Sequence, residues 1–215
     1  MNHKSIQKRG ILFYYQFYTT SMNKFIETKF SIPALKGISA KTVEEHLKLY
    51  AGYVNNLNTI HEIVENPTNP EYARREAYRR QGFEFGGMRN HEYYFKSFEG
   101  GSKVLSQESS LYKKIAETTG SFDTFLTVLK NLALTRGVGW AMLGYDKNTD
   151  RLIQYWVDEQ HLGHLPGVSI VLAIDMWEHS FVADYQPSGK KQYVEDFFAN
   201  INWEVIEKNF TEAKR

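Results

Sequence analysis

The clearest chemical pattern in the sequence is an aspartate at the end of an apolar segment. Asp175 directly follows an apolar run over residues 170–174 that predicts a buried strand, and His179 comes four residues later. A carboxylate in that place must be paired, hydrogen-bonded or bound to a metal, because an isolated buried charge is costly. Carboxylate and imidazole both bind first-row transition metals. The spacing alone is equally consistent with Asp175 capping the N-terminus of the next helix.

Two further histidines lie among apolar and aromatic residues. His46 falls on the apolar face of a predicted helix, and His91 lies in the aromatic-rich segment 90–95. Taken one at a time, each is more typical of a hydrogen-bonded core residue than of a metal ligand.

The elements that would carry these histidines are two long helices. The hydrophobic periodicity predicts a helix from the N-cap Ser39 to about Glu65, a break over residues 66–70, and a second helix to about residue 98. The short connection favours an antiparallel hairpin.

The second half of the chain changes from helix to strand and back. We predict helices at about 107–119 and 121–135, strands at 140–145, 152–157 and 168–174, and helical segments at 178–184, 190–199 and 202–212. The fold class is therefore α+β, with an N-terminal long antiparallel helical hairpin and a C-terminal α/β lobe holding a small three-stranded antiparallel sheet. We divide the chain into an extension (1–21), a hairpin domain (22–101) and an α+β domain (102–215).

Composition narrows the function classes. The net charge of +1 does not favour nucleic acid or an anionic membrane. The absence of cysteine excludes disulfides, thiolate metal sites, iron–sulfur clusters and cysteine nucleophiles. No apolar run approaches the roughly 20 residues that span a bilayer.

Residues 1–21 leave two interpretations open. They carry Lys4, Lys8 and Arg9, a short apolar stretch and no acidic residue. They form either a disordered extension or a targeting leader without a clear cleavage site. We expect a cytoplasmic location, with the leader role left open.

Residues 175–179 read D-M-W-E-H, which matches the D-x-W-E-H pattern of the iron/manganese superoxide dismutases. The sequence resembles this family from about residue 24 to residue 210, with the matching segments in the right order. Those segments are 39–46, 53–58, 90–91, 120–123, 139–141 and 202–204.

The resemblance implies one iron or manganese ion per subunit, bound by His46 and His91 from the hairpin and by Asp175 and His179 from the second lobe. It implies an oxidoreductase that converts superoxide, its small-molecule substrate, to dioxygen and hydrogen peroxide by alternating M³⁺/M²⁺ states. Zinc is excluded as the catalytic metal because it has no redox chemistry. The resemblance also implies a homodimer or homotetramer.

In the family, a glutamine or histidine hydrogen-bonds the solvent molecule on the metal. One usual position for it is Gly87 here, which cannot serve; the other lies in the loop 158–164. An ungapped alignment places Gln160 there, and a shift of one residue would place His161. A loop glutamine is usual in the manganese type, but Ala173 fits neither type, so the choice of metal stays open.

Other residues take roles from the same resemblance. Tyr53 corresponds to the tyrosine at the entrance of the site, and Tyr50 stands where a second histidine is usual. Trp140 and Trp177 correspond to the aromatic wall of the site. Glu178 corresponds to the glutamate that reaches the ligand histidine of the partner subunit.

Two rival functions remain at this stage. A non-haem iron oxygenase would use two histidines and one carboxylate. A helical binding module would use the histidines only as core residues. Metal analysis with a superoxide assay separates these from a dismutase.

Overall fold

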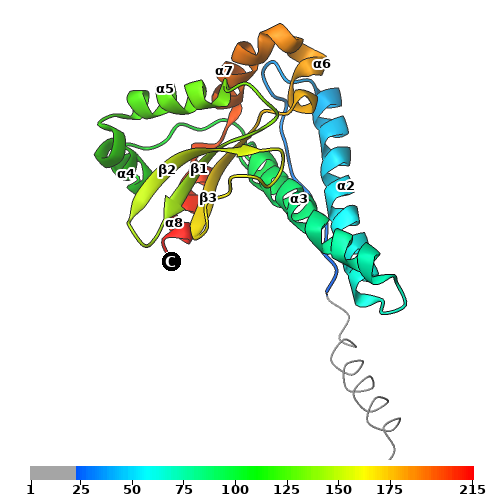
Figure 1. Ribbon diagram of the computed structural model, residues 1–215. Helices are drawn as coiled ribbons and strands as arrows, with labels where there is room; N and C mark the ends of the chain where they lie inside the picture. The colour runs from blue at the N-terminus through cyan, green and yellow to red at the C-terminus, as the bar shows by residue number, and fades with distance from the viewer. Residues whose placement is uncertain (1–22) are drawn as a thin grey trace, which may run out of the picture.

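The computed structural model describes residues 23–215, and its N-terminal part is a long helical hairpin (Figure 1). Helix α2 (Ala40–Glu65) and helix α3 (Glu71–Lys96) lie antiparallel. Helix α2 begins where predicted, because the Ser39 side chain accepts a hydrogen bond from the backbone N–H of Thr42. The interpretation of residues 1–21 as leader or extension lies outside the described residues.

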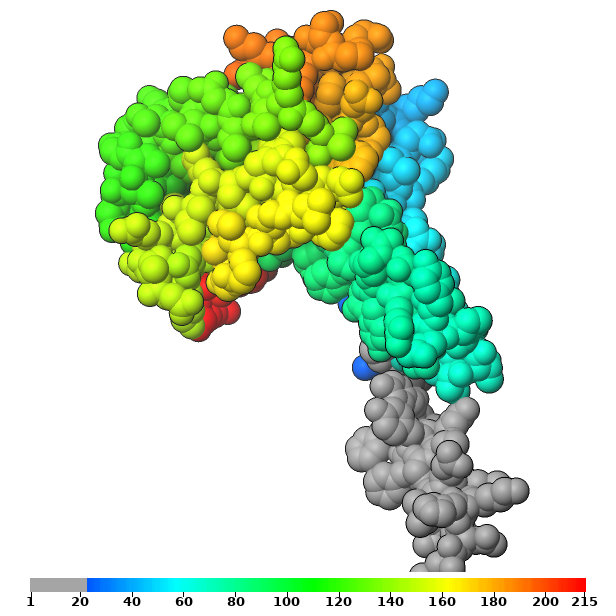
Figure 2. Space-filling view, in the orientation of Figure 1, coloured from blue at the N-terminus to red at the C-terminus, as the bar shows by residue number. Residues whose placement is uncertain are grey.

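The C-terminal part combines a sheet with short helices, and the space-filling view shows it as the broad end of the molecule (Figure 2). Its first helices are α4 (Ser110–Thr119) and α5 (Phe122–Ala133). Three strands follow: β1 (Gly139–Asp146), β2 (Arg151–Asp158) and β3 (Val168–Asp175). The chain ends with η1 (Glu178–Ser180), α6 (Val182–Tyr185), η2 (Pro187–Gly189), α7 (Lys190–Asn200) and α8 (Trp203–Ala213).

The sheet has the order β2-β1-β3 with antiparallel pairing throughout. Strand β1 is central and almost wholly buried, so it reads as a continuous apolar run rather than an alternating one. The α+β class and the three-stranded antiparallel sheet are therefore confirmed.

The hairpin and the sheet share one hydrophobic core. Helix α3 packs against β3, and the start of α2 contacts η1. Trp140 from β1 packs against Tyr94 from α3, which in turn stacks on Phe197 from α7. Because the core is continuous, the domain boundary at residues 101–102 stays a prediction.

An extended segment, residues 23–39, runs along the hairpin before α2 begins. Its Thr28 N–H donates to the Tyr50 hydroxyl at 2.8 Å. Its Lys36 exchanges hydrogen bonds with the Asn200 side chain, both at 2.8 Å. The segment thus joins the hairpin to α7. Within residues 23–215, no helix is both long and apolar enough to cross a membrane.

Two glycines in α3 permit its close approach to neighbouring elements. A Cβ atom at Gly86 would lie 2.1 Å from the backbone oxygen of Gln160, and one at Gly87 would lie 2.4 Å from the Tyr53 ring. Both contacts are too short for any side chain. Helix α3 therefore tolerates poor helix formers here in order to meet the loop after β2 and helix α2.

We predict that Gly86→Ala destabilises the fold by about 1–3 kcal/mol, because the backbone of Gln160 must move. Gly52→Ala is the matched control, since nothing lies within 4 Å of a Cβ there. That change should stabilise α2 by up to about 1 kcal/mol. Denaturant midpoints of both variants test this, and equal stability of the two would contradict it.

Candidate metal centre

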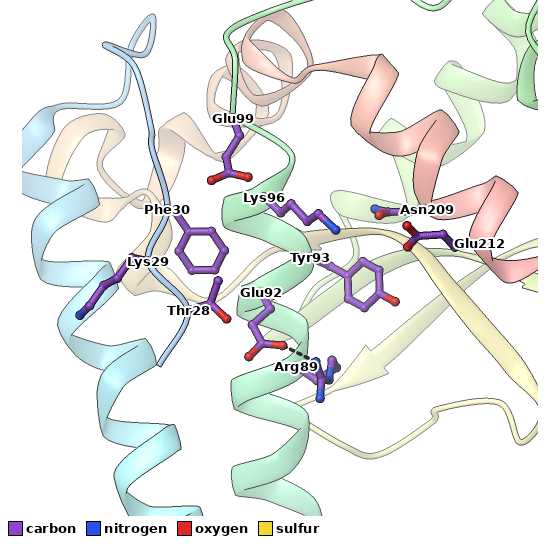
Figure 3. Close-up of a pocket in the computed structure, with 10 residues that line it drawn as sticks. All are labelled: Thr28, Lys29, Phe30, Arg89, Glu92, Tyr93, Lys96, Glu99, Asn209 and Glu212. Atoms are coloured by element: carbon purple, nitrogen blue, oxygen red, sulfur yellow. Dashed lines mark hydrogen bonds and ion pairs between the residues drawn. The ribbon is translucent and has the colours of Figure 1, made fainter. Parts of the chain in front are cut away.

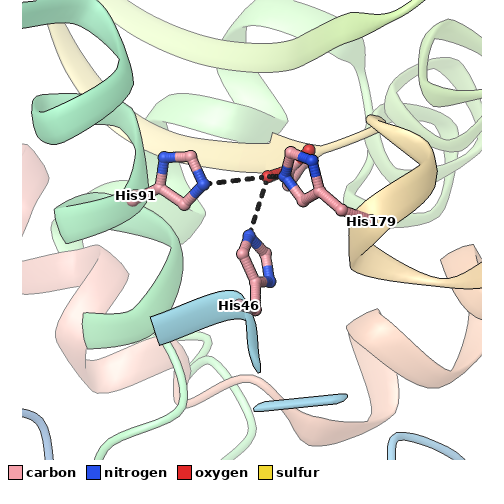
Figure 4. A group of neighbouring side chains, drawn as sticks. His46, His91 and His179 are labelled. Carbon is pink, nitrogen blue, oxygen red and sulfur yellow. Dashed lines mark hydrogen bonds and ion pairs between the residues drawn. The ribbon is translucent and has the colours of Figure 1, made fainter. Parts of the chain in front are cut away.

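Four side chains from four elements meet where the hairpin reaches the sheet. They are His46 of α2, His91 of α3, Asp175 at the end of β3 and His179 of η1, and one ligand atom from each lies within 4.8 Å of all the others. Figure 4 shows the three imidazole rings pointing at one carboxylate. The structure therefore brings together all four residues that the resemblance named.

The ligand atoms converge on one oxygen atom. The Nε2 atoms of His46 and His179 each lie 3.1 Å from Asp175 Oδ2, and Nε2 of His91 lies 3.5 Å from it. The His91 Nε2 atom is buried without a hydrogen-bond partner. A buried ring nitrogen without a partner requires an explanation. A cation among these four atoms would provide it, so the donor set fits a metal ion.

The two oxygens of Asp175 have different partners. Oδ1 accepts a hydrogen bond from the backbone N–H of Trp177 at 2.8 Å, while Oδ2 faces the histidines. The backbone oxygen of Asp175 accepts from the Tyr193 hydroxyl at 2.9 Å and from Ser180 Oγ at 3.1 Å. The turn after β3 thus hydrogen-bonds Oδ1 of Asp175, and Oδ2 stays directed at the three histidines.

The backbone also orients His91. Its Nδ1–H donates to the carbonyl oxygen of Gly87 at 2.5 Å. A donor at Nδ1 leaves Nε2 with a free lone pair when the ring is neutral, which is the form that binds metals. Helix α3 therefore selects the tautomer that faces Asp175.

Burial and charge keep His46, His91 and Asp175 in the protonation states that bind a metal. Burial alone would raise the pKa of Asp175, but the charge and hydrogen bond of His179 and the hydrogen bond of His46 outweigh it and hold the pKa below its usual range. Burial lowers the pKa of His46 and lowers the pKa of His91 to about 3. These two neutral imidazoles and an ionised carboxylate need not lose a proton to bind a cation.

Gln160 lies beside the cluster, fully buried, in the loop that follows β2. Its Oε1 accepts from Trp140 Nε1 at 2.9 Å, and its Nε2 donates to the Tyr53 hydroxyl at 2.9 Å. An indole N–H can only donate, so the orientation of the amide is fixed. One N–H of Gln160 and the O–H of Tyr53 remain free to donate.

The loop is held by its own backbone. Asp158 and Leu162 pair across it, and the N–H of Glu159 donates to the carbonyl of Val138. Asn90 Nδ2 donates to the backbone oxygen of Gln160 at 3.1 Å. These contacts direct the side chain of Gln160 inward.

His161, the alternative to Gln160, lies differently. Its ring contacts Phe83 edge-on with centroids 5.7 Å apart, and no hydrogen bond joins it to Tyr53 or Trp140. The structure therefore brings Gln160, and not His161, into contact with those two side chains.

The remaining residues named from the sequence surround the cluster unequally. Trp140 contacts His91 edge-on at 4.9 Å, and Trp177 stacks on His179 at 5.7 Å. Tyr50 is buried and donates to Glu92 Oε1 at 3.2 Å. Glu178 is exposed and belongs to none of the four ligand positions.

Sequence reasoning missed two contributors. Tyr193 holds the backbone of Asp175 from α7, and Asn90 holds the backbone of Gln160 from α3. Only the position of Asn90 beside His91 offered a signal, because Tyr193 comes to the site through tertiary packing alone.

A separate pocket of about 310 Å³ lies beside α3 (Figure 3). Its charged groups have both signs, and two of them, Arg89 and Glu92, pair with each other. None of the four clustered residues lines it. The residues that line it are Thr28, Lys29, Phe30, Arg89, Glu92, Tyr93, Lys96, Glu99, Asn209 and Glu212.

Comparison with known proteins agrees with the geometry. Residues 107–209 match the family described as iron/manganese superoxide dismutases, C-terminal domain. The chain is 33% identical over 190 residues to a protein of Aquifex aeolicus named superoxide dismutase [Fe], covering 84% of this chain and 88% of that protein. It is 31% identical to superoxide dismutase [Fe] of Tetrahymena pyriformis, covering 78% and 89% of the two chains. It is 32% identical to superoxide dismutase [Mn] of Mycobacterium lepraemurium, covering 78% and 82%.

Proposed function

This chain belongs to the iron/manganese superoxide dismutases, and from that premise we propose how its own residues support the reaction. It is a metal-dependent superoxide dismutase that uses iron or manganese and converts superoxide to dioxygen and hydrogen peroxide. The observation that carries the proposal is the convergence of three imidazole nitrogens on Asp175 Oδ2.

We assign His46, His91, Asp175 and His179 as the metal ligands. When bound, iron or manganese supplies one-electron chemistry that takes an electron from one superoxide and gives it to the next. The protein supplies three imidazoles and one carboxylate, and the carboxylate lowers the net charge of the largely buried site. Four segments must come together to supply them, so the site depends on the complete fold.

His46→Ala, His91→Ala, Asp175→Ala and His179→Ala should each lose most of the metal and abolish activity. The reason is that each of the four residues lies on a different element, so the remaining three do not form a site by themselves. Metal content by mass spectrometry and a superoxide assay measure the result. His61→Ala is the control, because His61 lies outside the cluster and contacts Phe25 instead. Full activity in any one of the four ligand variants would refute the assignment.

We propose that Gln160 and Tyr53 control the solvent that binds the metal. Each retains one hydrogen-bond donor after bonding to the other. Burial raises the pKa of Tyr53, and the charges of Asp175 and Glu84 raise it further, so the hydroxyl stays a donor at neutral pH. The role of Gln160 is to favour one charge state of that solvent, and thereby one redox state of the metal.

Gln160→Ala should shift the reduction potential by on the order of 100 mV and lower activity, while the metal stays bound. One charge-assisted hydrogen bond is worth about 1.5–3 kcal/mol. For a one-electron couple, about 1.4 kcal/mol corresponds to roughly 59 mV. Potentials of wild type and variant, compared on the same metal, give the measurement.

His161→Ala is the matched control for Gln160→Ala, because the neighbouring side chain lies against Phe83. It should leave the potential nearly unchanged. The opposite pattern, with His161 critical and Gln160 silent, would overturn this assignment.

We also propose a homodimer or homotetramer in which Glu178 reaches the ligand histidine of the partner subunit. Glu178 supports this because it is exposed, flanks His179 and forms no ion pair among the described residues. The contact between Glu178 and the ligand histidine of the partner subunit would then occur twice, because the two-fold symmetry of an isologous interface repeats each contact.

Glu178→Ala should weaken subunit association and lower activity together, because each site would lose a contact from its partner. Analytical ultracentrifugation and the superoxide assay measure the two effects. Glu108→Ala is the control, since that residue precedes α4 and is also exposed. A fully active wild-type monomer would contradict the proposal.

The cytoplasmic location stays a prediction. Residues 1–21, where a leader would lie, are outside the described part of the chain, so fractionation of cells that express the full chain is the direct test.

A further inference from the structure

The metal centre reaches solvent on the side of His179 and Tyr53. The side chains of His46, His91 and Asp175 are at most 2% exposed, whereas that of His179 is 21% exposed. Tyr53 is also partly exposed and carries a free O–H after accepting from Gln160. A small anion that enters the centre therefore passes these two residues.

A charged group lies immediately outside Tyr53. Arg80 Nε donates to Glu84 Oε1 at 3.3 Å, and Asn56 Nδ2 donates to the second oxygen of Glu84 at 3.3 Å. The guanidinium carbon lies 3.5 Å from the centroid of the Phe83 ring, and that ring contacts Tyr53 with centroids 6.0 Å apart. The Phe83 ring therefore contacts both the Arg80 guanidinium and Tyr53 at the entrance of the site.

The two charges of this pair are not equally accessible. The Glu84 side chain is 8% exposed and faces inward to Asn56, whereas the Arg80 side chain is 50% exposed. The member of the pair that meets solvent is therefore the positive one, although the pair is neutral as a whole. The charge of Arg80 also reaches Tyr53, since it opposes the rise in the pKa of that hydroxyl.

We propose that Arg80 is the residue that steers the anionic substrate to the entrance at Tyr53, with Glu84 and Phe83 holding its guanidinium in place. A positive group beside the entrance raises the local concentration of anions and the rate of productive encounter. Arg80 acts on the approach of superoxide and makes no contact with the metal ligands.

A purely structural role is the competing explanation, because the Arg80–Glu84–Asn56 contacts also join α3 to α2. The dependence of activity on ionic strength distinguishes the steering role from the structural role. Steering decays with the Debye length, which falls from about 30 Å at 0.01 M to about 3 Å at 1 M ionic strength. A packing defect persists at all salt concentrations.

The test compares Arg80→Gln, Arg80→Lys and Glu84→Gln in the metal-loaded enzyme. At 10 mM ionic strength, Arg80→Gln should lower kcat/KM by about 2- to 5-fold, and the difference should vanish near 0.5 M. Arg80→Lys should restore most of the loss. Glu84→Gln should raise kcat/KM at low salt, because it removes the opposing charge and keeps the hydrogen-bonding shape.

A second measurement does not depend on turnover. Azide serves as a stable monovalent anion whose binding to the metal-loaded protein is followed by absorbance. Arg80→Gln should weaken azide binding by about 2- to 3-fold at low salt and not at high salt. Arg79→Gln is the matched control, since Arg79 is paired with Glu76 and is 73% exposed. Its effect in both assays should be clearly smaller than that of Arg80→Gln, since Arg79 does not contact Phe83 beside Tyr53.

Loss of activity that is independent of salt, or a fall in both Arg80→Gln and Glu84→Gln, overturns the proposal in favour of a structural role. No loss in Arg80→Gln overturns it as well. The inference rests on the proposed metal site, but the two fail separately. Retained metal and activity in the ligand variants would refute the site, whereas an unaltered salt dependence in Arg80→Gln would refute only the steering.

Discussion

The buried carboxylate of Asp175 is the constraint on which the rest of the structure depends. It ends a strand in the core and stays ionised, so it needs compensation that water cannot supply there. Three imidazoles approach one of its oxygens, and two of the rings are held neutral by burial. Without a cation this arrangement leaves a ring nitrogen unpaired. The centre is therefore complete only when a metal joins four segments that the chain separates widely.

This requirement explains the close approaches elsewhere in the fold. His91 can face β3 only if α3 lies against the sheet, and α3 then meets the loop after β2 at Gly86. Next to it, Gly87 leaves room for the Tyr53 ring and provides the carbonyl that orients His91. Two residues that weaken a helix by propensity are thus required by the site, a local conflict typical of functional regions.

Much of the fold could be predicted from the sequence, because its signals are local. The Ser39 cap, the break before α3 and the turn between β1 and β2 each depend on a few adjacent residues. The site was harder, since a ligand histidine on an apolar face looks the same as a core histidine until its partners are known. Whether Gln160 or His161 contacts Trp140 and Tyr53 depends on the three-dimensional path of the loop, which the sequence does not specify. The pair of Asn56 and Glu84 joins two helices and has no sequence signature.

A buried carboxylate with its own set of partners occurs at two depths in the molecule. At the centre, the carboxylate of Asp175 is enclosed and its histidines surround it. Further out, the carboxylate of Glu84 faces inward while its arginine faces solvent. If Arg80 steers the substrate as proposed, an anion that approaches Tyr53 meets an exposed guanidinium before it reaches the buried carboxylates of Glu84 and Asp175. For a reaction whose reactant is a small anion, this arrangement favours entry, since Arg80 offsets the charge of Glu84 and a bound metal would offset that of Asp175.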